Sequence, residues 1–223
     1  MTAVVFALAL GVAPIQAAHA SPTHSSADYS SFFGDGELRG AGWATCAPIT
    51  WSADTRGLTS AQARREIARL RDAWALWAEA AGVKAVFTGR EDLAYDPASY
   101  GLVPADGSAP VEQHVYIAFK ARKQVPILTG GAVGLAKPTL VLVEERRIVG
   151  GIAIFMRRYA IEQARSNPSA LAHVYAHELG HVLGLGHAVS RANVMYPEVQ
   201  SVGSLGDGDA SGIARITQEC PAA

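Results

Sequence analysis

The stretch HELGHVLGLGH, from His177 to His187, places three histidines and one glutamate at fixed intervals. Its first part, up to Leu183, lies in a proline-free run from Ser169 that is predicted to be a helix. Four residues advance a helix by about 6 Å and rotate it by about 40°, so His177 and His181 share one face. Both imidazoles can therefore bind one metal ion, which constrains the fold around them.

The remaining residues of this stretch complete the pattern of a catalytic metal site. Glu178 points to the side of the histidine pair, where a carboxylate can reach water on the metal without being a ligand. Gly184 can adopt a left-handed conformation and end the helix, so that His187 returns as third ligand. Three nitrogen ligands leave a fourth position open, as in catalytic zinc sites. The spacing predicts one catalytic Zn²⁺ bound by His177, His181 and His187, with Glu178 as general base.

Chance is a poor explanation of this spacing. Random placement with this composition gives the pattern in roughly 3 of 100,000 such chains, so a surface helix that is merely rich in histidine is a weak alternative.

The size and charge of the chain limit its organisation. With 223 residues and 49% hydrophobic content, it can bury one good-sized core, so we expect one principal domain. The net charge is −1, from 19 basic and 20 acidic residues. No global field favours nucleic acid or an anionic membrane, and we expect a monomer without a nucleic-acid partner.

The first twenty residues are typical of a secretory signal. They contain no Asp, Glu, Lys or Arg and end in Ala18-His19-Ala20, with small residues at the two positions that a signal peptidase needs. Pro14 interrupts an apolar run that is shorter than the roughly 20 residues of a membrane span, so no stable membrane anchor is expected. The sequence predicts a signal peptide over 1–20, a secreted, extracellular protein, and an exposed leader over 21–44.

The chain has two cysteines, Cys46 and Cys220, and a secreted protein can keep them as a disulfide. A disulfide between them would join the two ends of the domain, and a loop of this length corresponds to a stabilisation of roughly 5 kcal/mol at most. Two buried free thiols, or Cys46 as a metal ligand, are the alternatives.

Further periodic segments predict a mixed α/β (α+β) fold. ITWSAD, Ile49 to Asp54, alternates as a strand does. Thr59 and Gln62 form a capping-box pattern that opens an amphipathic helix with Trp74 and Trp77 in its buried stripe. Four more segments are strand candidates, the last two joined as a hairpin by residues 144–147. These four are VKAVFTG, HVYIAFK, TLVLV and IVGGIAIF.

A long connection rich in Pro, Gly and Asp, from Asp92 to Gln113, separates two of the predicted strands. Such a connection is often functional or stabilised by an ion. Asp92, Asp96 and Asp106 are candidate Ca²⁺ ligands, although their spacing matches no calcium-loop signature.

The histidine stretch resembles the zinc-binding signature of the metzincin metalloendopeptidases. NVMYP, Asn193 to Pro197, is similar to their Met-turn, so Met195 takes the place of the methionine beneath the zinc ligands. The Met-Tyr-Pro form and the third histidine resemble the matrixin branch, in its secreted bacterial type. LGDGDASGI, Leu205 to Ile213, is similar to the entry of the matrixin C-terminal helix. The resemblance extends from about Pro48 to Ile216.

The resemblance implies a secreted zinc endopeptidase that acts on proteins or peptides. Its fold would be a metzincin-like twisted mixed sheet with two long helices, in one catalytic domain over 45–223 that divides into 45–184 and a small C-terminal subdomain, 185–223. GLAKP resembles the substrate-binding edge strand. The implied substrate-binding residues are Gly134, Leu135, Ala136, His173, Pro197, Glu198 and Val199.

His173 has two interpretations. In matrixins the residue at its offset helps to line the S1′ pocket, which accepts the side chain just after the scissile bond, and residues 197–199 would form the pocket wall. An ordinary packed or solvated helix histidine is the alternative for His173.

The chain also departs from the matrixin pattern. Lys137 stands where matrixins have a histidine for a second, structural zinc, so one zinc is expected. No propeptide cysteine switch is present, because Cys46 lacks the flanking pattern. Tyr196 directly follows Met195 and is expected to be structural. Two other functions remain open: a secreted zinc-binding or adhesion module without turnover, and a zinc hydrolase of a non-peptide bond. Glu178 argues against the first, because binding needs only histidines.

Overall fold

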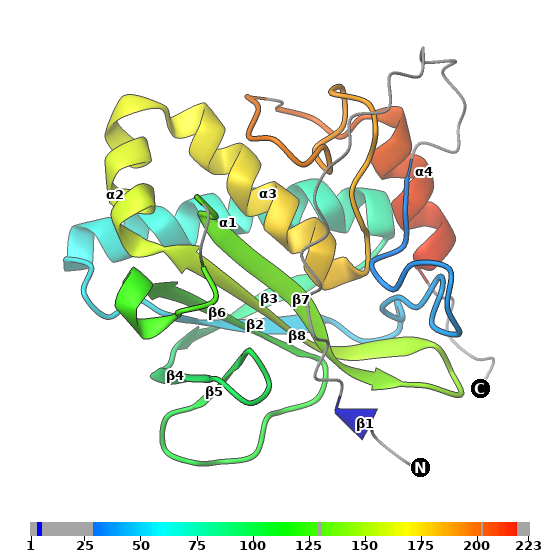
Figure 1. Ribbon diagram of the computed structural model, residues 1–223, viewed down its shortest axis with the longest axis horizontal. Coiled ribbons are helices and arrows are strands. Elements are labelled where there is room, and N and C mark those ends of the chain that lie inside the picture. Colours follow the sequence, from blue (N-terminus) through cyan, green and yellow to red (C-terminus); the bar gives the residue numbers. More distant parts are fainter. Residues whose placement is uncertain (1–3, 6–28, 129–130, 202, 218–223) are drawn as a thin grey trace.

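A computed structural model describes residues 4–5, 29–128, 131–201 and 203–217 of the 223-residue chain. It contains a six-stranded sheet in the order β1-β7-β8-β6-β2-β3 and a two-stranded hairpin of β4 and β5 (Figure 1). The strands are β1 (Val4–Val5), β2 (Ile49–Asp54), β3 (Ala85–Arg90), β4 (Leu93–Asp96), β5 (Gly101–Pro104), β6 (His114–Lys120), β7 (Gly134–Leu142) and β8 (Arg147–Met156). The helices are α1 (Ser60–Ala81), the 3-10 helix η1 (Arg122–Gln124), α2 (Arg157–Ser166), α3 (Pro168–Leu183) and α4 (Asp207–Ile216).

The predicted mixed α/β architecture is confirmed. Strands β8, β6, β2 and β3 run parallel, while β7 lies antiparallel to β8 and forms the predicted hairpin with it. The two residues of β1 lie within the predicted signal segment and pair with the far end of β7, at Leu140 and Val141. They leave the first half of β7, from Gly134 to Lys137, without a strand partner on its outer side among the described residues.

The predicted start of the first long helix is confirmed in detail. The Thr59 side chain accepts a hydrogen bond from the Gln62 backbone, and the Gln62 side chain accepts one from the Thr59 backbone. Gly82 ends α1 in a left-handed conformation. Trp74 and Trp77 are both buried, and the Trp77 indole donates to the carbonyl of Ala176 on α3, at 2.7 Å. This bond joins α1 to the helix that carries the histidines.

Helices and hairpin cover opposite faces of the sheet (Figure 1). The larger core cluster joins α1 and α3 to one face through side chains such as Trp51, Leu70 and Leu179. The smaller cluster lies on the other face, where Leu93 and Leu102 of the hairpin pack near Ile152. Apolar layers therefore cover both faces of the sheet, and the β7 edge borders the cleft described below.

The β4–β5 hairpin and helix α2 are among the elements that were not predicted. The segment from Asp92 to Gln113, expected to be a loop, contains the β4–β5 hairpin, whose short strands carry too few residues to reveal their alternation. Helix α2 follows β8 without an intervening loop, so the apolar run of the strand obscures where the helix begins.

The described part of the predicted exposed leader, residues 29–44, packs against the domain. Ala41 is fully buried and Trp43 is 2% exposed, and the Trp43 indole donates to the carbonyl of Val182. Residues 41–44 of the predicted leader are therefore buried, whereas residues 34–37 are exposed. Main-chain bonds and apolar side chains attach the segment without any periodic pattern. No described helix is long and apolar enough to cross a membrane.

Cys220 lies outside the described residues, so the Cys46–Cys220 disulfide stays a prediction. The signal peptide, secretion and the division of the domain at residue 184 likewise stay predictions.

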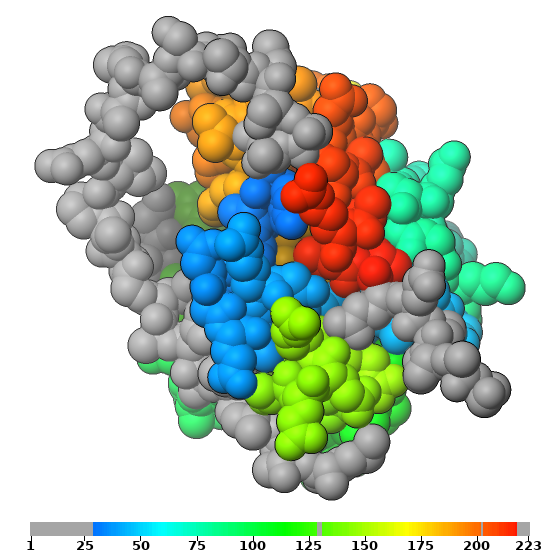
Figure 2. Space-filling view, turned by 90° about the vertical axis from the view of Figure 1, so that its right-hand side faces the viewer, coloured from blue at the N-terminus to red at the C-terminus, as the bar shows by residue number. Residues whose placement is uncertain are grey.

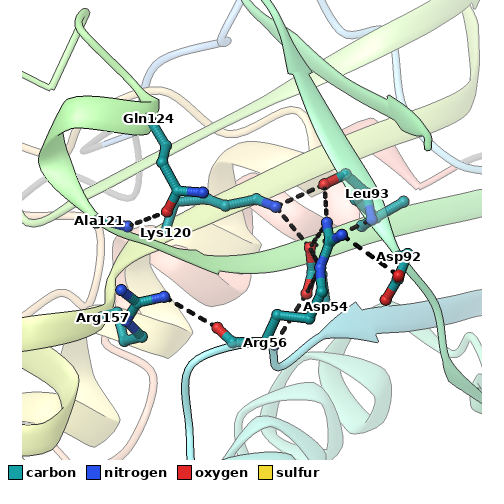
Figure 3. Close-up of polar contacts among 8 residues, drawn as sticks. All are labelled: Asp54, Arg56, Asp92, Leu93, Lys120, Ala121, Gln124 and Arg157. Atoms are coloured by element: carbon teal, nitrogen blue, oxygen red, sulfur yellow. Dashed lines mark hydrogen bonds and ion pairs between the residues drawn. The ribbon is translucent and has the colours of Figure 1, made fainter.

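A charge cluster around the buried side chains of Asp54 and Lys120 fixes the ends of β2 and β6 (Figure 3). The Lys120 ammonium donates to Asp54 at 2.5 Å and to the carbonyl of Leu93 at 2.6 Å. The Arg56 guanidinium donates to the same carboxylate and to the same carbonyl. The backbone N–H of Leu93 also donates to Asp54. The cluster thereby attaches the start of the β4–β5 hairpin to the main sheet.

The Asp54 carboxylate should make the fold sensitive to acid. Burial by itself would raise its pKa, but the bonds from Arg56 and Lys120 outweigh burial and lower the pKa from 3.8 to about 2. A lowered folded-state pKa contributes stability above the unfolded pKa, and that stability is lost as the pH falls from about 4 to about 2. The full contribution is about 2 kcal/mol.

Urea unfolding of wild type and Asp54→Asn, at pH 5 and pH 3, tests this expectation. The difference between their unfolding free energies should shrink by about 1 kcal/mol from pH 5 to pH 3, because only wild type loses this contribution. A difference that is the same at both pH values would show that Asp54 does not titrate as described.

Candidate active site

Helix α3 and the turn after it bring the three predicted histidines together. The Asn167 side chain accepts a hydrogen bond from the backbone N–H of Ala170, and Pro168 occupies the first turn, as the sequence predicts. Gly184 ends α3 with a φ of 106°. A side chain there would also lie 2.7 Å from the carbonyl oxygen of Ala41. Only glycine therefore permits the turn that returns His187 to the helix.

The ligand atoms of His177, His181 and His187 lie within 4.8 Å of one another. Among the described residues, no other group of three or more histidines, cysteines or carboxylates lies so close together. Three imidazole nitrogens at this spacing form a donor set that suits zinc.

Backbone carbonyls orient two of these rings. The Nδ1 atoms of His177 and His181 lie 2.8 Å from the carbonyl oxygens of Val194 and Leu185. A ring that donates from Nδ1 has its lone pair on Nε2, which is the atom left to bind a metal. Burial lowers the pKa of His177 to about 4 and that of His181 well below its ordinary value, and it also lowers the pKa of His187. The rings are therefore neutral near pH 7, as ligands must be.

Glu178 lies beside the histidines at the start of the edge strand. It is 8% exposed, and burial raises its pKa to about 8. A cation held by the histidines would lower that pKa again, because opposite charge favours the carboxylate. A Cβ atom at Gly134 would lie 2.7 Å from the Glu178 carboxyl carbon. The glycine therefore allows β7 to pass directly against this side chain.

Met195 lies beneath α3, where a side chain at Gly180 would overlap its sulfur atom. Asp209 of α4 holds this turn in place: its carboxylate accepts from the backbone N–H groups of Val194, at 2.6 Å, and Met195, at 3.1 Å. The carbonyl of Val194 then contacts His177. A continuous set of bonds thus runs from α4 through the methionine turn to the first histidine.

A cleft of about 1200 Å³ opens over these groups. Its lining includes all the residues predicted to bind metal, act as base or contact substrate. These are Gly134, Leu135, Ala136, His173, His177, Glu178, His181, His187, Pro197, Glu198 and Val199. The structure therefore gathers in one cleft residues that lie up to 65 positions apart in the sequence, from 134 to 199.

His173 has a special place in this cleft. It is 2% exposed, and both of its ring nitrogens are buried without a hydrogen-bond partner. Its ring centroid lies 6.1 Å from that of His177. Of the described side chains with unpartnered buried atoms, only His173 lines the cleft. The side chain is thus packed, and it still offers polar atoms at the cleft.

The β4–β5 hairpin contributes a cleft wall that the sequence did not reveal. Tyr95, Pro97 and Tyr100 line the cleft, and the hairpin turn is attached to β7 by Lys137. The Lys137 ammonium, on a side chain only 8% exposed, donates to the carbonyl of Ser99 at 2.6 Å. Lys137, which stands where matrixins have a zinc-binding histidine, therefore forms a hydrogen bond to the hairpin.

The three candidate calcium ligands have separate partners. Asp92 forms an ion pair with Arg56, Asp96 accepts hydrogen bonds within the hairpin turn, and Asp106 accepts one from the backbone of Ser108. They do not form a metal-binding group in the described part of the chain. Calcium binding therefore stays untested.

Tyr196 also lines the cleft, where the Arg191 guanidinium lies 4.8 Å from its ring centroid.

Comparison with known proteins agrees with this geometry. The family model described as Matrixin matches residues 136–217, a span that contains the three histidines, Glu178 and Met195. Matrixins are zinc-dependent metallopeptidases of the metzincin group, so the predicted resemblance to matrixins is confirmed for this span. The secreted bacterial type stays a prediction. A search of curated proteins finds no match to the chain.

Proposed function

We propose that this chain, a matrixin-like protein, is a secreted zinc-dependent endopeptidase. The observation that carries the proposal is the convergence of three neutral histidines and a buried glutamate at one end of an edge strand. The uncharged segment over 1–20 and the cysteine pair support secretion.

The residues of the cleft have separate parts in peptide hydrolysis. When bound by the three histidines, zinc lowers the pKa of water to about 7 and polarises a carbonyl. Glu178 accepts the proton of the attacking water and passes it to the leaving amine. Backbone groups of residues 134–136 help to stabilise the oxyanion that develops on the substrate.

The edge strand favours an extended peptide as substrate. The outer side of residues 134–137 carries no strand partner in the described structure, so its backbone can pair with a substrate chain. The Glu178 side chain lies beside Gly134, the first residue of this strand. A peptide paired there would place a backbone carbonyl beside the histidines, within reach of the water that Glu178 would deprotonate.

Two other functions use the same cleft. A zinc-binding or adhesion module needs the histidines and has no use for a buried carboxylate beside them. A zinc hydrolase of a non-peptide bond would need the same base, and the free strand edge argues for the peptide enzyme instead.

Incubation of the purified protein with a proteome-derived peptide library tests the proposal. We expect new peptide ends in the wild-type sample, their loss after chelation and their return with added zinc. A protein that binds zinc and releases no peptides would favour the adhesion module. Turnover of ester or amide model compounds without peptide cleavage would favour the other hydrolase.

We further propose that His173 makes the pocket after the scissile bond shallower or more polar than an aliphatic residue would. The unpartnered ring nitrogens support this, because they cost free energy unless a group entering the cleft bonds to them. His173→Leu should raise the kcat/KM for large apolar residues after the cut, relative to glutamine there, by about 5- to 100-fold.

Cleavage profiles of wild type and His173→Leu, at equal zinc content, measure this ratio. His173→Asn serves as the conservative variant and should keep the wild-type preference, because its side chain still offers a donor and an acceptor. Identical profiles for all three proteins would leave His173 as a packed helix residue.

A further inference from the structure

Residues 30–32 form a short strap along the turn that carries the third histidine. Ser31 and Leu185 form an antiparallel bridge. The backbone N–H of Phe32 donates to the carbonyl of Gly184 at 2.9 Å, and that of Gly186 donates to the carbonyl of Ser30 at 2.7 Å. The strap therefore pairs with both residues that flank Leu185.

Two side chains of the strap also reach the histidines. The Ser30 hydroxyl donates to the backbone carbonyl of His187 at 2.8 Å. The ring of Phe32 lies edge-on to that of His181, with 5.9 Å between centroids. The strap thus contacts two of the three predicted ligands: the backbone carbonyl of His187 and the ring of His181.

The turn is shaped to receive the strap. A Cβ atom at Gly186 would lie 2.9 Å from the carbonyl oxygen of Ser31 and would overlap the Ser30 hydroxyl. The absence of a side chain at position 186 therefore allows the two backbones to approach. Without the strap, the carbonyls of Gly184 and His187 would lose these protein donors.

The segment that carries the strap is attached at both ends. Before it, Tyr29 packs against α4, where a Cβ at Gly212 would lie 2.9 Å from Tyr29, and the Arg215 guanidinium lies 5.6 Å from its ring. After it, Trp43 bonds to α3. Figure 2 shows this segment, in blue, lying against α4, in red.

We propose that the strap is a positioning element for the metal site: residues 30–32 hold the turn after α3 so that His187 meets the two helical histidines. His177 and His181 are already fixed by α3, whereas His187 lies outside any helix or strand. The strap adds to the bonds that Ala188 and Leu185 already make with Met195 and Gly180, so that less entropy is lost when a metal binds. This inference rests on the proposed zinc function.

Zinc affinity of the full-length protein tests the strap directly. Ser30→Ala removes the hydroxyl bond to His187. Ser30→Ala with Phe32→Pro also removes the backbone donor to Gly184 and the ring beside His181. Partners that orient metal ligands typically change affinity by about 10- to 100-fold, so the double variant should raise the zinc Kd by that factor. Ser30→Ala alone should show a smaller increase in the same direction. Competition with a chromogenic chelator gives the Kd.

Asp35→Ala is the matched control, because Asp35 lies in the same segment, is exposed, and pairs only with Arg39 among the described side chains. It should keep the wild-type Kd. Circular dichroism of the zinc-free proteins checks that the variants are folded, and Ser30→Ala decides the question if the double variant is not. Ser30→Ala with wild-type Kd, or an equal loss in the control, would overturn the positioning role. A wild type that binds no zinc would contradict the proposed function itself.

Discussion

Glu178→Ala should keep zinc and fold while losing about 100-fold or more in turnover, the usual scale for removal of a general base. The carboxylate lies at the cleft beside the histidines and has no described hydrogen-bond partner that its removal would leave unpaired. Its loss therefore removes proton transfer without breaking a structural bond. Single-turnover measurements with a peptide substrate give the rate of the chemical step.

Two further variants make this result specific. Glu178→Gln keeps the size of the side chain, including its contact with Gly134, and should lose as much activity as alanine. Glu162→Ala removes an exposed glutamate on α2 that pairs only with Arg158 among the described residues, and should leave turnover unchanged. Near-normal turnover in either Glu178 variant would assign the base to another residue.

His187→Ala should weaken zinc binding by more than about 100-fold, since even the partners that orient ligands account for 10- to 100-fold. Two histidines on one helix cannot complete a three-ligand site. Metal bound only to the folded state stabilises it, so chelation should lower the melting temperature of wild type and have little effect on the variant.

Elemental analysis after dialysis measures this prediction. We expect one zinc per wild-type chain and none in the variant. His173→Leu is the matched histidine control on the same helix and should retain its zinc, because His173 is not in the metal-binding group. Unchanged zinc in His187→Ala would show that the third ligand lies elsewhere.

The metal-binding group could be predicted because its geometry follows from local spacing. Histidines four residues apart on a helix share a face whatever surrounds them. Gly184 marks the end of the helix, and the return of His187 follows from its left-handed conformation. The capping residues Thr59 and Asn167 could be recognised for the same reason, because capping depends on neighbours within three positions.

What the sequence did not reveal depends on contacts between distant segments. The strap attaches mainly through backbone atoms, which leave no pattern in the side chains. The partner of Lys137 is a backbone carbonyl 38 residues away, in a hairpin too short to predict. The unpartnered nitrogens of His173 likewise depend on packing, because its position on the helix alone does not determine burial.

The contact between Gly134 and Glu178 links two positions that lie 44 residues apart. Any side chain at 134 would enter the space of the glutamate, so a substitution there is tolerated only if residue 178 becomes smaller or moves. A larger residue at 134 would therefore displace the carboxylate from its place beside the histidines. The shape of the edge strand and the position of the general base are set together, at a point where the three metal-binding histidines are not involved.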